Sequence, residues 1–417
     1  MDRTPRLSPD DDLGQHVLQL IRTRRELYRR RDANSHGRQM HDAVSLLEAH
    51  QPDTDPAEFF SIVQKALMSS LRVLLRADDS SGIIGDAARR LLKLHPRAAA
   101  AANVKPAKLV DWMMKFQFEE EVSFFELDVV EYASALGESG IALYRRRLQE
   151  VAEPLGPEPA PREVWSSPHS RAWWTLHHNA RRLAVLDRDV DEIIRTHARD
   201  HSVAKWLEDT SQALEEIGEI DLAIEWARRA TDHDLGFQSS GAARRWISLV
   251  AAHRPEELVD AAHHVFSRWP TSGSALSLRD AAGDRWPEFR AAVQSRLRER
   301  PDEAVLFAIA DESPERALKL AFELGITSEM TWDELARALG SVNPGEAILI
   351  HFMLAEGELR EASAGNYREV ARRLRFVRAL AAGAGKEREV DEFIASLREA
   401  HRRRPRLQQE FTRAGLP

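Results

Sequence analysis

The sequence contains no cysteine among its 417 residues. Disulfide bonds, thiolate nucleophiles, iron–sulfur clusters and thiolate-bound zinc are therefore excluded from this chain. Lysine is also scarce, with eight of the 59 basic residues, so arginine carries most of the positive charge. The arginines are spread along the chain, and 67 acidic residues bring the net charge to -8. This balance argues against attraction of nucleic acid or anionic membrane to the surface as a whole.

Long hydrophobic runs are missing too. Apolar runs such as residues 305–310 and 347–350 fall far short of the roughly 18 to 20 residues that a membrane span needs. The first residues, MDRTPRLSPDDD, are polar and lack the apolar core of a secretory signal. We therefore expect a cytoplasmic protein with no membrane partner.

Helical periodicity dominates the rest of the sequence, while β-branched residues are sparse and never alternate over a segment. Val17, Ile21, Leu27 and Tyr28 lie on one stripe of a first predicted helix. Further helices are predicted at residues 37–49, 56–76 and 83–94, with Asp55 as the cap of the second of these. The sequence predicts an all-α protein.

Five prolines mark a boundary. They stand at positions 154, 157, 159, 161 and 168, which is too dense for a helix interior and typical of a linker. We therefore predict an N-terminal helical domain over residues 12–150, a proline-rich linker over 151–169 and a C-terminal domain over 170–417.

The C-terminal domain shows weak internal repetition. Prolines that can open a helix stand at positions 255, 287, 314 and 344, and these intervals are typical of helix–turn–helix repeats. Residues 207–230 come nearest to a tetratricopeptide pattern, with Gly218 at the turn and Ala223 and Ala230 at close helix contacts. We predict a helical bundle followed by a tetratricopeptide-like α-solenoid, whose stacked helix pairs form a long binding surface.

Histidines and carboxylates give little support for catalysis. His197 and His201 are spaced i, i+4 and resemble the outline of an inverted zinc-protease motif, but Asp200 replaces its glutamate. Other histidine pairs, such as 177–178 and 263–264, have no third ligand marked by spacing. Nucleophile elbows, Walker loops and dinucleotide-binding glycine motifs are absent from the sequence. We expect no metal site, no cofactor and no enzymatic activity.

Two arginine clusters provide an alternative function. The candidate nucleic-acid contacts are Arg22, Arg25, Arg29, Arg30 and Arg31 near the N-terminus, and Arg402, Arg403 and Arg404 near the C-terminus. Arginine-rich helices can neutralise phosphates, and Tyr28 could stack on a base. The other interpretation is a solvated helix face, with cations that favour a helix C-terminus at residues 402–404.

Several stretches together resemble a known family. They are Arg76–Asp86, Leu92–His95, Glu131–Arg145, Arg182–Asp191, and the tail with Arg402–Pro405 and Ala414–Leu416. They resemble the long helical region that follows the zinc finger in bacterial SWIM zinc-finger proteins, over residues 15–417. The resemblance implies a tetratricopeptide-like fold beside a separately encoded partner. The finger itself needs C-x-C and C-x-H, so its zinc and its nucleic-acid role do not carry over to a chain without cysteine.

The sequence therefore favours a non-enzymatic scaffold or adaptor that holds a protein partner on its helical repeats. We expect the contact surface near residues 200–350. A nucleic-acid-binding accessory protein is the alternative.

Overall fold

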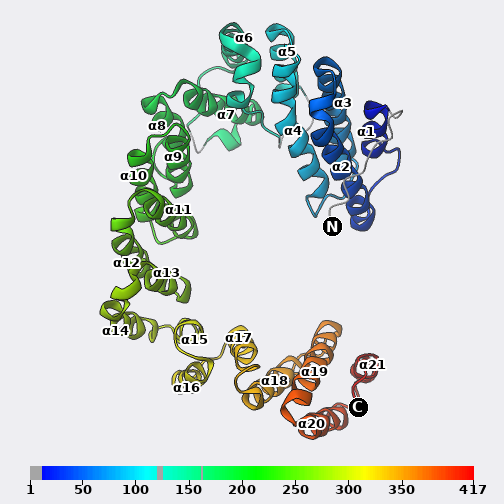
Figure 1. Cartoon of the computed structure of the whole chain (residues 1–417), viewed down its shortest axis with the longest axis vertical. Helices are drawn as coiled ribbons and strands as arrows, with labels where there is room; N and C mark the ends of the chain where they lie inside the picture. The colour runs from blue at the N-terminus through cyan, green and yellow to red at the C-terminus, as the bar shows by residue number, and fades with distance from the viewer. Residues whose placement is uncertain (1–11, 120–124, 161–162) are drawn as a thin grey trace. The chain divides into compact units, whose positions relative to one another are not determined.

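The computed structural model describes residues 12–119, 125–160 and 163–417, and it builds these ranges from α-helices (Figure 1). The one extended pairing in these ranges is an isolated parallel bridge between Leu27 and Ala77. The all-α prediction is therefore confirmed. The chain divides into two compact units, Met1–Ala230 and Thr231–Pro417.

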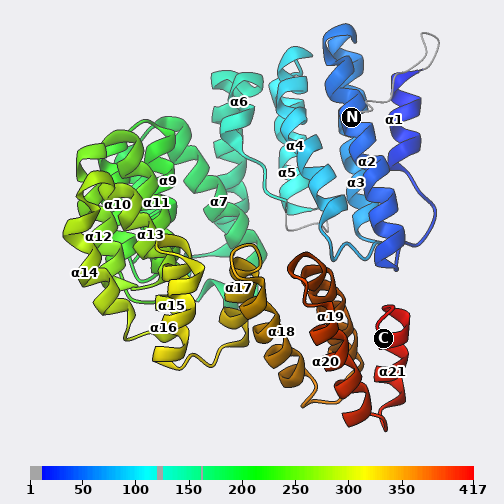
Figure 2. The same ribbon diagram turned by 60° about the horizontal axis from the view of Figure 1, so that its bottom comes forward.

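The first unit begins as a helical bundle. Its helices are α1 (Leu13–Ile21), α2 (Arg30–His50), α3 (Pro56–Leu74), α4 (Ile83–Ala101), α5 (Pro106–Phe118), α6 (Val129–Ala152), α7 (Ser170–Asp187), α8 (Val190–Ala198), α9 (Ala204–Glu216) and α10 (Ile220–Asp232), the last of which reaches into the second unit. Helices α1 to α5 stand side by side in both views (Figures 1 and 2). One hydrophobic core joins these helices and extends from Val17 to Leu183.

The first helix is shorter than the sequence predicts. It ends at Ile21, and Arg22 already has an extended backbone. The reason lies in a distant segment: Leu27 N–H donates to the Arg76 carbonyl at 3.1 Å, and Asp78 N–H donates to the Leu27 carbonyl at 2.8 Å. Leu27 is buried in this loop. The apolar residue that the sequence places on a helix stripe therefore packs into the core from a loop.

The helices that follow also differ in their bounds from the predicted ranges. The predicted helix 37–49 begins earlier, at Arg30, and the predicted helix 83–94 continues to Ala101 through the buried Pro96. The start of α3 is as predicted, because the Asp55 carboxylate accepts from the N–H groups of Ala57 and Glu58 and Pro56 opens the helix.

The compact units divide at a different place from the predicted linker. The segment between α6 and α7 does hold short 3₁₀ turns, such as Glu153–Leu155, rather than a continuous helix. Nevertheless α7 packs against α5 and α6, and its buried Leu183 belongs to the core of the first unit. The prolines interrupt the helix but do not end the packing, so the contact boundary lies at Ala230.

The second unit is a solenoid. Its helices are α11 (Phe237–His253), α12 (Leu258–Arg268), α13 (Ser272–Ala282), α14 (Trp286–Leu297), α15 (Pro301–Asp311), α16 (Pro314–Leu324), α17 (Glu329–Leu339), α18 (Pro344–Glu358), α19 (Ala364–Ala384), α20 (Glu387–Ala400) and α21 (Pro405–Arg413). Each helix packs on the helices next or next-but-one to it in the sequence. Local stacking of this kind defines an α-solenoid, and it confirms the predicted fold class.

The repeated prolines open helices in two of the four cases. Pro314 and Pro344 are the first residues of α16 and α18, and the side chains of Ser313 and Asn343 cap these helices. Pro287 is the second residue of α14, and Pro255 begins a 3₁₀ turn that precedes α12. Gly218 occupies the predicted turn between α9 and α10 at φ +85°, a backbone conformation that favours glycine.

Among the helices in the described ranges, none has both the length and the apolar character that crossing a bilayer requires.

Candidate interaction surfaces

Between Glu346 and Glu356, helix α18 is almost entirely apolar on its solvent-facing side as well as on its packed side, which is unusual for a surface helix. Its sequence, PGEAILIHFMLAEGE, buries Ile348, Ile350 and Leu354 against its neighbours. The opposite side carries Leu349 and Met353, which retain 55% and 44% of their exposure. Glu346 and Glu356 lie on this same side, so the apolar part that lacks a cover is the stretch between them.

Other exposed apolar side chains lie on neighbouring helices. More than half of the large apolar side chains that the described ranges leave exposed fall between residues 322 and 376. We call them the exposed apolar set: Phe322, Met330, Val342, Leu349, Met353 and Phe376. Two of their rings are held in place, because Phe322 packs on Trp332 and Phe376 packs edge-on against His351. Such concentrations of apolar surface commonly mark interaction sites.

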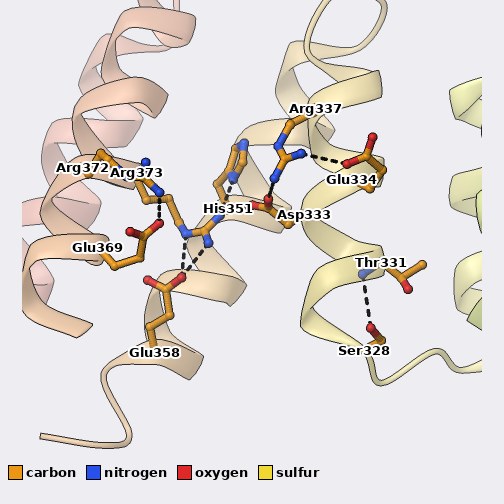
Figure 3. A network of polar contacts seen from close by, with 10 residues as sticks. All are labelled: Ser328, Thr331, Asp333, Glu334, Arg337, His351, Glu358, Glu369, Arg372 and Arg373. Atoms are coloured by element: carbon orange, nitrogen blue, oxygen red, sulfur yellow. Dashed lines mark hydrogen bonds and ion pairs between the residues drawn. The ribbon is translucent and has the colours of Figure 1, made fainter. Parts of the chain in front are cut away.

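A largely buried polar network connects α17, α18 and α19 (Figure 3). Arg373 of α19 forms ion pairs with Asp333 of α17 at 2.5 Å and with Glu358 of α18 at 2.6 Å. The same guanidinium donates to Nδ1 of His351 at 3.1 Å. Because an arginine cannot accept a hydrogen bond, His351 must be the acceptor through Nδ1, and Arg373 therefore joins α17, α18 and α19 at one point.

The pKa values in this network follow from burial and pairing. Burial and, to a smaller extent, the charge of Arg373 lower the pKa of His351 to about 4, so the ring is neutral at pH 7. Burial alone would raise the pKa of Asp333, but its bonds to Arg373 and Arg337 hold it below the ordinary value. Burial disfavours the charge on Arg373, yet Glu358 and Asp333 keep its pKa raised. The network is therefore charged and paired at neutral pH.

The N-terminal arginine cluster does not lie on one helix. Arg22 caps the end of α1, Arg25 is exposed in the loop that follows, and Arg29, Arg30 and Arg31 stand at the beginning of α2. The N-terminus of a helix carries partial positive charge, so the last three are placed where cations are electrostatically unfavourable. Arg22 alone of these five turns back across the bundle, where its Nε donates to Ser69 of α3 at 3.3 Å.

Tyr28 stands in the same loop. It is exposed, and a hydrogen bond with Glu26 raises its pKa.

The C-terminal arginine cluster belongs to the second unit. Arg402 forms an ion pair with Glu399, and Arg404 donates to the carbonyl of Leu359, just beyond α18, at 2.7 Å. Arg403 is exposed. Two of these three arginines therefore have structural partners.

The histidine pair at 197 and 201 does not converge on one point. Helix α8 ends at Ala198, and Arg199 and His201 both have positive φ angles, so the i, i+4 helical spacing is lost. His197 is buried, contacts the Ile193 carbonyl through Nδ1, and burial lowers its pKa to about 4. In the part of the chain that the structure describes, no group of three His, Asp or Glu side chains could hold a metal ion.

One protein family matches most of the sequence. The model of DUF6880, a family of unknown function, matches residues 15–407. The chain belongs to this family. No curated protein matches it. Among solved structures, the chain is similar to one described as a circular tandem repeat protein with novel repeat topology and enhanced subunit contact surfaces. The identity is 16%, the match covers 97% of this chain and 98% of that chain, and the TM-score is 0.18, which is too low to carry an argument.

Proposed function

We propose that the chain is a non-enzymatic scaffold that holds a protein partner on its helical repeats. The observation that carries this proposal is the solvent-facing side of α18, where Leu349 and Met353 remain exposed between Glu346 and Glu356. Burying one exposed leucine or methionine side chain is worth about 1.5 to 3 kcal/mol. The partner's surface would therefore be apolar where it meets α18.

The solenoid supports this proposal in a second way. Stacked helix pairs give an extended surface that is usually used to bind another chain. The network at Arg373 holds α17, α18 and α19 together before any partner arrives, which reduces the ordering that binding would cost. The proposed surface, residues 322–376, overlaps only the end of the range 200–350 that the sequence favours.

The experiment compares partner recovery by two charge-introducing variants. The tagged full chain and the variant Leu349→Asp are purified from the native host, and the recovered proteins are identified by mass spectrometry. The matched control is Leu75→Asp, because Leu75 is exposed to a similar degree, 50% against 55%, but belongs to the first unit. We expect one or more partners with the wild type and with Leu75→Asp, and their loss with Leu349→Asp.

Two results would contradict the proposal. One is equal recovery of the same partner by Leu349→Asp and the wild type. The other is recovery of a metabolite or nucleotide instead of a protein, which would favour an enzymatic or small-molecule role. The resemblance to the helical region of SWIM zinc-finger proteins and the cytoplasmic location remain predictions, and a separately encoded partner would agree with both.

A further inference from the structure

A recess between α1, α3 and α5 of the first unit collects positive charge. It consists of a cavity of about 960 Å³ and a second one of about 360 Å³. The two cavities share Arg22, Lys65, Ser69 and Arg72 in their walls and therefore form one continuous groove, which we call the basic groove.

The charge in the basic groove is strongly one-sided. Its cations are Arg22, Arg24, Lys65, Arg72, Arg76 and Lys115, and its acids are Asp12 and Glu58. The acids stand at the starts of α1 and α3, where Asp12 caps α1 by accepting from the Gln15 N–H. Four of the cations lie at or just beyond the opposite ends of these helices, whereas Lys65 lies midway along α3 and Lys115 lies in the last turn of α5. A chain of net charge -8 thus has a locally basic recess.

These cations also lack acidic partners. Elsewhere in the same unit, arginines form ion pairs, such as Arg90 with Glu48 and Arg145 with Asp187. In the described ranges, no carboxylate lies within ion-pair distance of the six groove cations. The polar contacts that fix them are neutral: Arg22 donates to Ser69 Oγ, and Arg76 donates to the carbonyls of Arg72 and Thr23. These bonds position the charges of Arg22 and Arg76 without neutralising them.

One side chain of the groove is aromatic. Trp112 of α5 lines the smaller cavity beside Lys65, Arg72 and Lys115. Its indole stacks on the buried His95 ring at 4.1 Å, so the aromatic group is held rigidly. Proteins that bind single-stranded nucleic acid combine a cationic groove that follows the backbone with aromatic side chains on which bases stack.

We propose that the basic groove binds single-stranded nucleic acid, with the backbone phosphates on Arg22, Lys65 and Arg72 and a base against Trp112. A recess suits a flexible strand, whereas a membrane presents a plane of headgroups to protruding side chains. An acidic peptide would satisfy the cations but would leave the aromatic wall without a stacking partner. The groove lies in the first unit, so its variants test a function separate from the scaffold surface on α18.

The test measures anisotropy of fluorescein-labelled oligothymidylate and oligouridylate, each of about twelve nucleotides, with the full chain. Salt is varied from about 50 to about 200 mM. Lys65→Gln/Arg72→Gln should weaken binding about tenfold or more at the lowest salt and reduce the slope of log K against log salt by about 1.4, or 0.7 for each lost phosphate contact. The control is Lys93→Gln/Arg97→Gln, which removes the same charges from exposed positions of α4 and should leave the slope unchanged.

The aromatic wall has its own variants. Trp112→Leu should weaken binding about tenfold, and Trp112→Phe should restore most of it, because base stacking needs an aromatic face. Circular dichroism and thermal unfolding check that each variant is folded.

The proposal is overturned if neither oligonucleotide binds at the lowest salt, or if both double variants weaken binding equally. It is also overturned if polyglutamate, heparin or phosphatidylserine vesicles bind as tightly as the oligonucleotides and with the same dependence on Lys65 and Arg72. The last outcome would identify an unspecific polyanion site.

Discussion

Replacing Arg373 by methionine should destabilise α17, α18 and α19 locally. Methionine has a similar length and packs well in apolar surroundings, so the change removes the charge and the hydrogen bonds while leaving most of the volume. The variant leaves Asp333 and Glu358, whose side chains are only 20% and 15% exposed, without their shared partner. Removing one member of a buried ion pair is costly because the other charge stays buried and uncompensated.

The expected loss of local stability depends on the ion pairs that each carboxylate keeps in the variant. Asp333 keeps a second ion pair with Arg337 of its own helix. Glu358 keeps no other ion pair in the described ranges, and its Oε2 atom is already buried without a hydrogen bond. Breaking buried pairs costs about 3 to 5 kcal/mol, and the remaining partner of Asp333 favours the lower end. A loss of about 3 kcal/mol corresponds to roughly a 150-fold change in the local opening equilibrium.

Hydrogen–deuterium exchange measured by mass spectrometry is the appropriate assay, because a solenoid opens in parts and a single global free energy does not describe it. Peptides from α17, α18 and α19 should exchange about 100-fold faster in Arg373→Met than in the wild type at pH 7. The matched control is Arg372→Met on the same helix. Arg372 is 71% exposed, and its one ion pair within the described ranges is with Glu369, one turn earlier, so exchange should change less than about threefold.

The reasoning is refuted if Arg373→Met and Arg372→Met exchange at the same rate. It is also refuted if the faster exchange spreads evenly over α11 to α21, since a local network should affect the helices it joins.

A change of pH and two glycine substitutions test the buried histidines of the first unit and the contacts of two helices. Burial lowers the pKa of His95 to about 3 and of His197 to about 4. Below about pH 6.5, these two histidines therefore bind protons in the unfolded chain but stay neutral in the native state. Stability should therefore fall between about pH 6.5 and pH 4, by up to about 1.4 kcal/mol per pH unit for each histidine; thermal unfolding should show a shallower fall in His197→Gln. Gly37→Ala should cost about 1 to 3 kcal/mol, because the added Cβ would lie 2.5 Å from Ile83 Cγ2. Gly383→Ala, with nothing within 4 Å, should instead stabilise α19 by up to about 1 kcal/mol; exchange rates that change in the same direction in both variants would contradict this.

The helices themselves could be predicted from the sequence because their signals are local. Asp55 before Pro56 and Ser313 before Pro314 cap helices through contacts within three residues, and these contacts need no tertiary structure. The repeated prolines and the 3.6-residue periodicity likewise indicate stacked helices. The absence of cysteine excludes whole classes of chemistry without any coordinates.

The two surfaces had signals in the sequence that were local but ambiguous. The apolar run at residues 347–350 indicates a buried or partnered helix, and only packing shows that Leu349 stays exposed while Ile348 and Ile350 are covered. Similarly, Lys65, Ser69 and Arg72 recur at helical spacing on α3 and mark a polar stripe, which Arg76 continues just beyond the end of the helix. The sequence does not reveal what faces that stripe.

Tertiary structure decided the rest, because exposure and charge pairing depend on residues far apart in the chain. Leu27 leaves the helix since the backbone near Arg76 fixes it, almost fifty residues away. Arg22 joins α3 in the basic groove, whereas Arg404 binds a carbonyl beyond α18. An arginine side chain can thus stand in a groove without an ion pair in the described ranges, as Arg22 does, or donate to a backbone carbonyl, as Arg404 does. Which of these two roles an arginine has depends on the residues near it in space, and the packing of whole helices determines those residues.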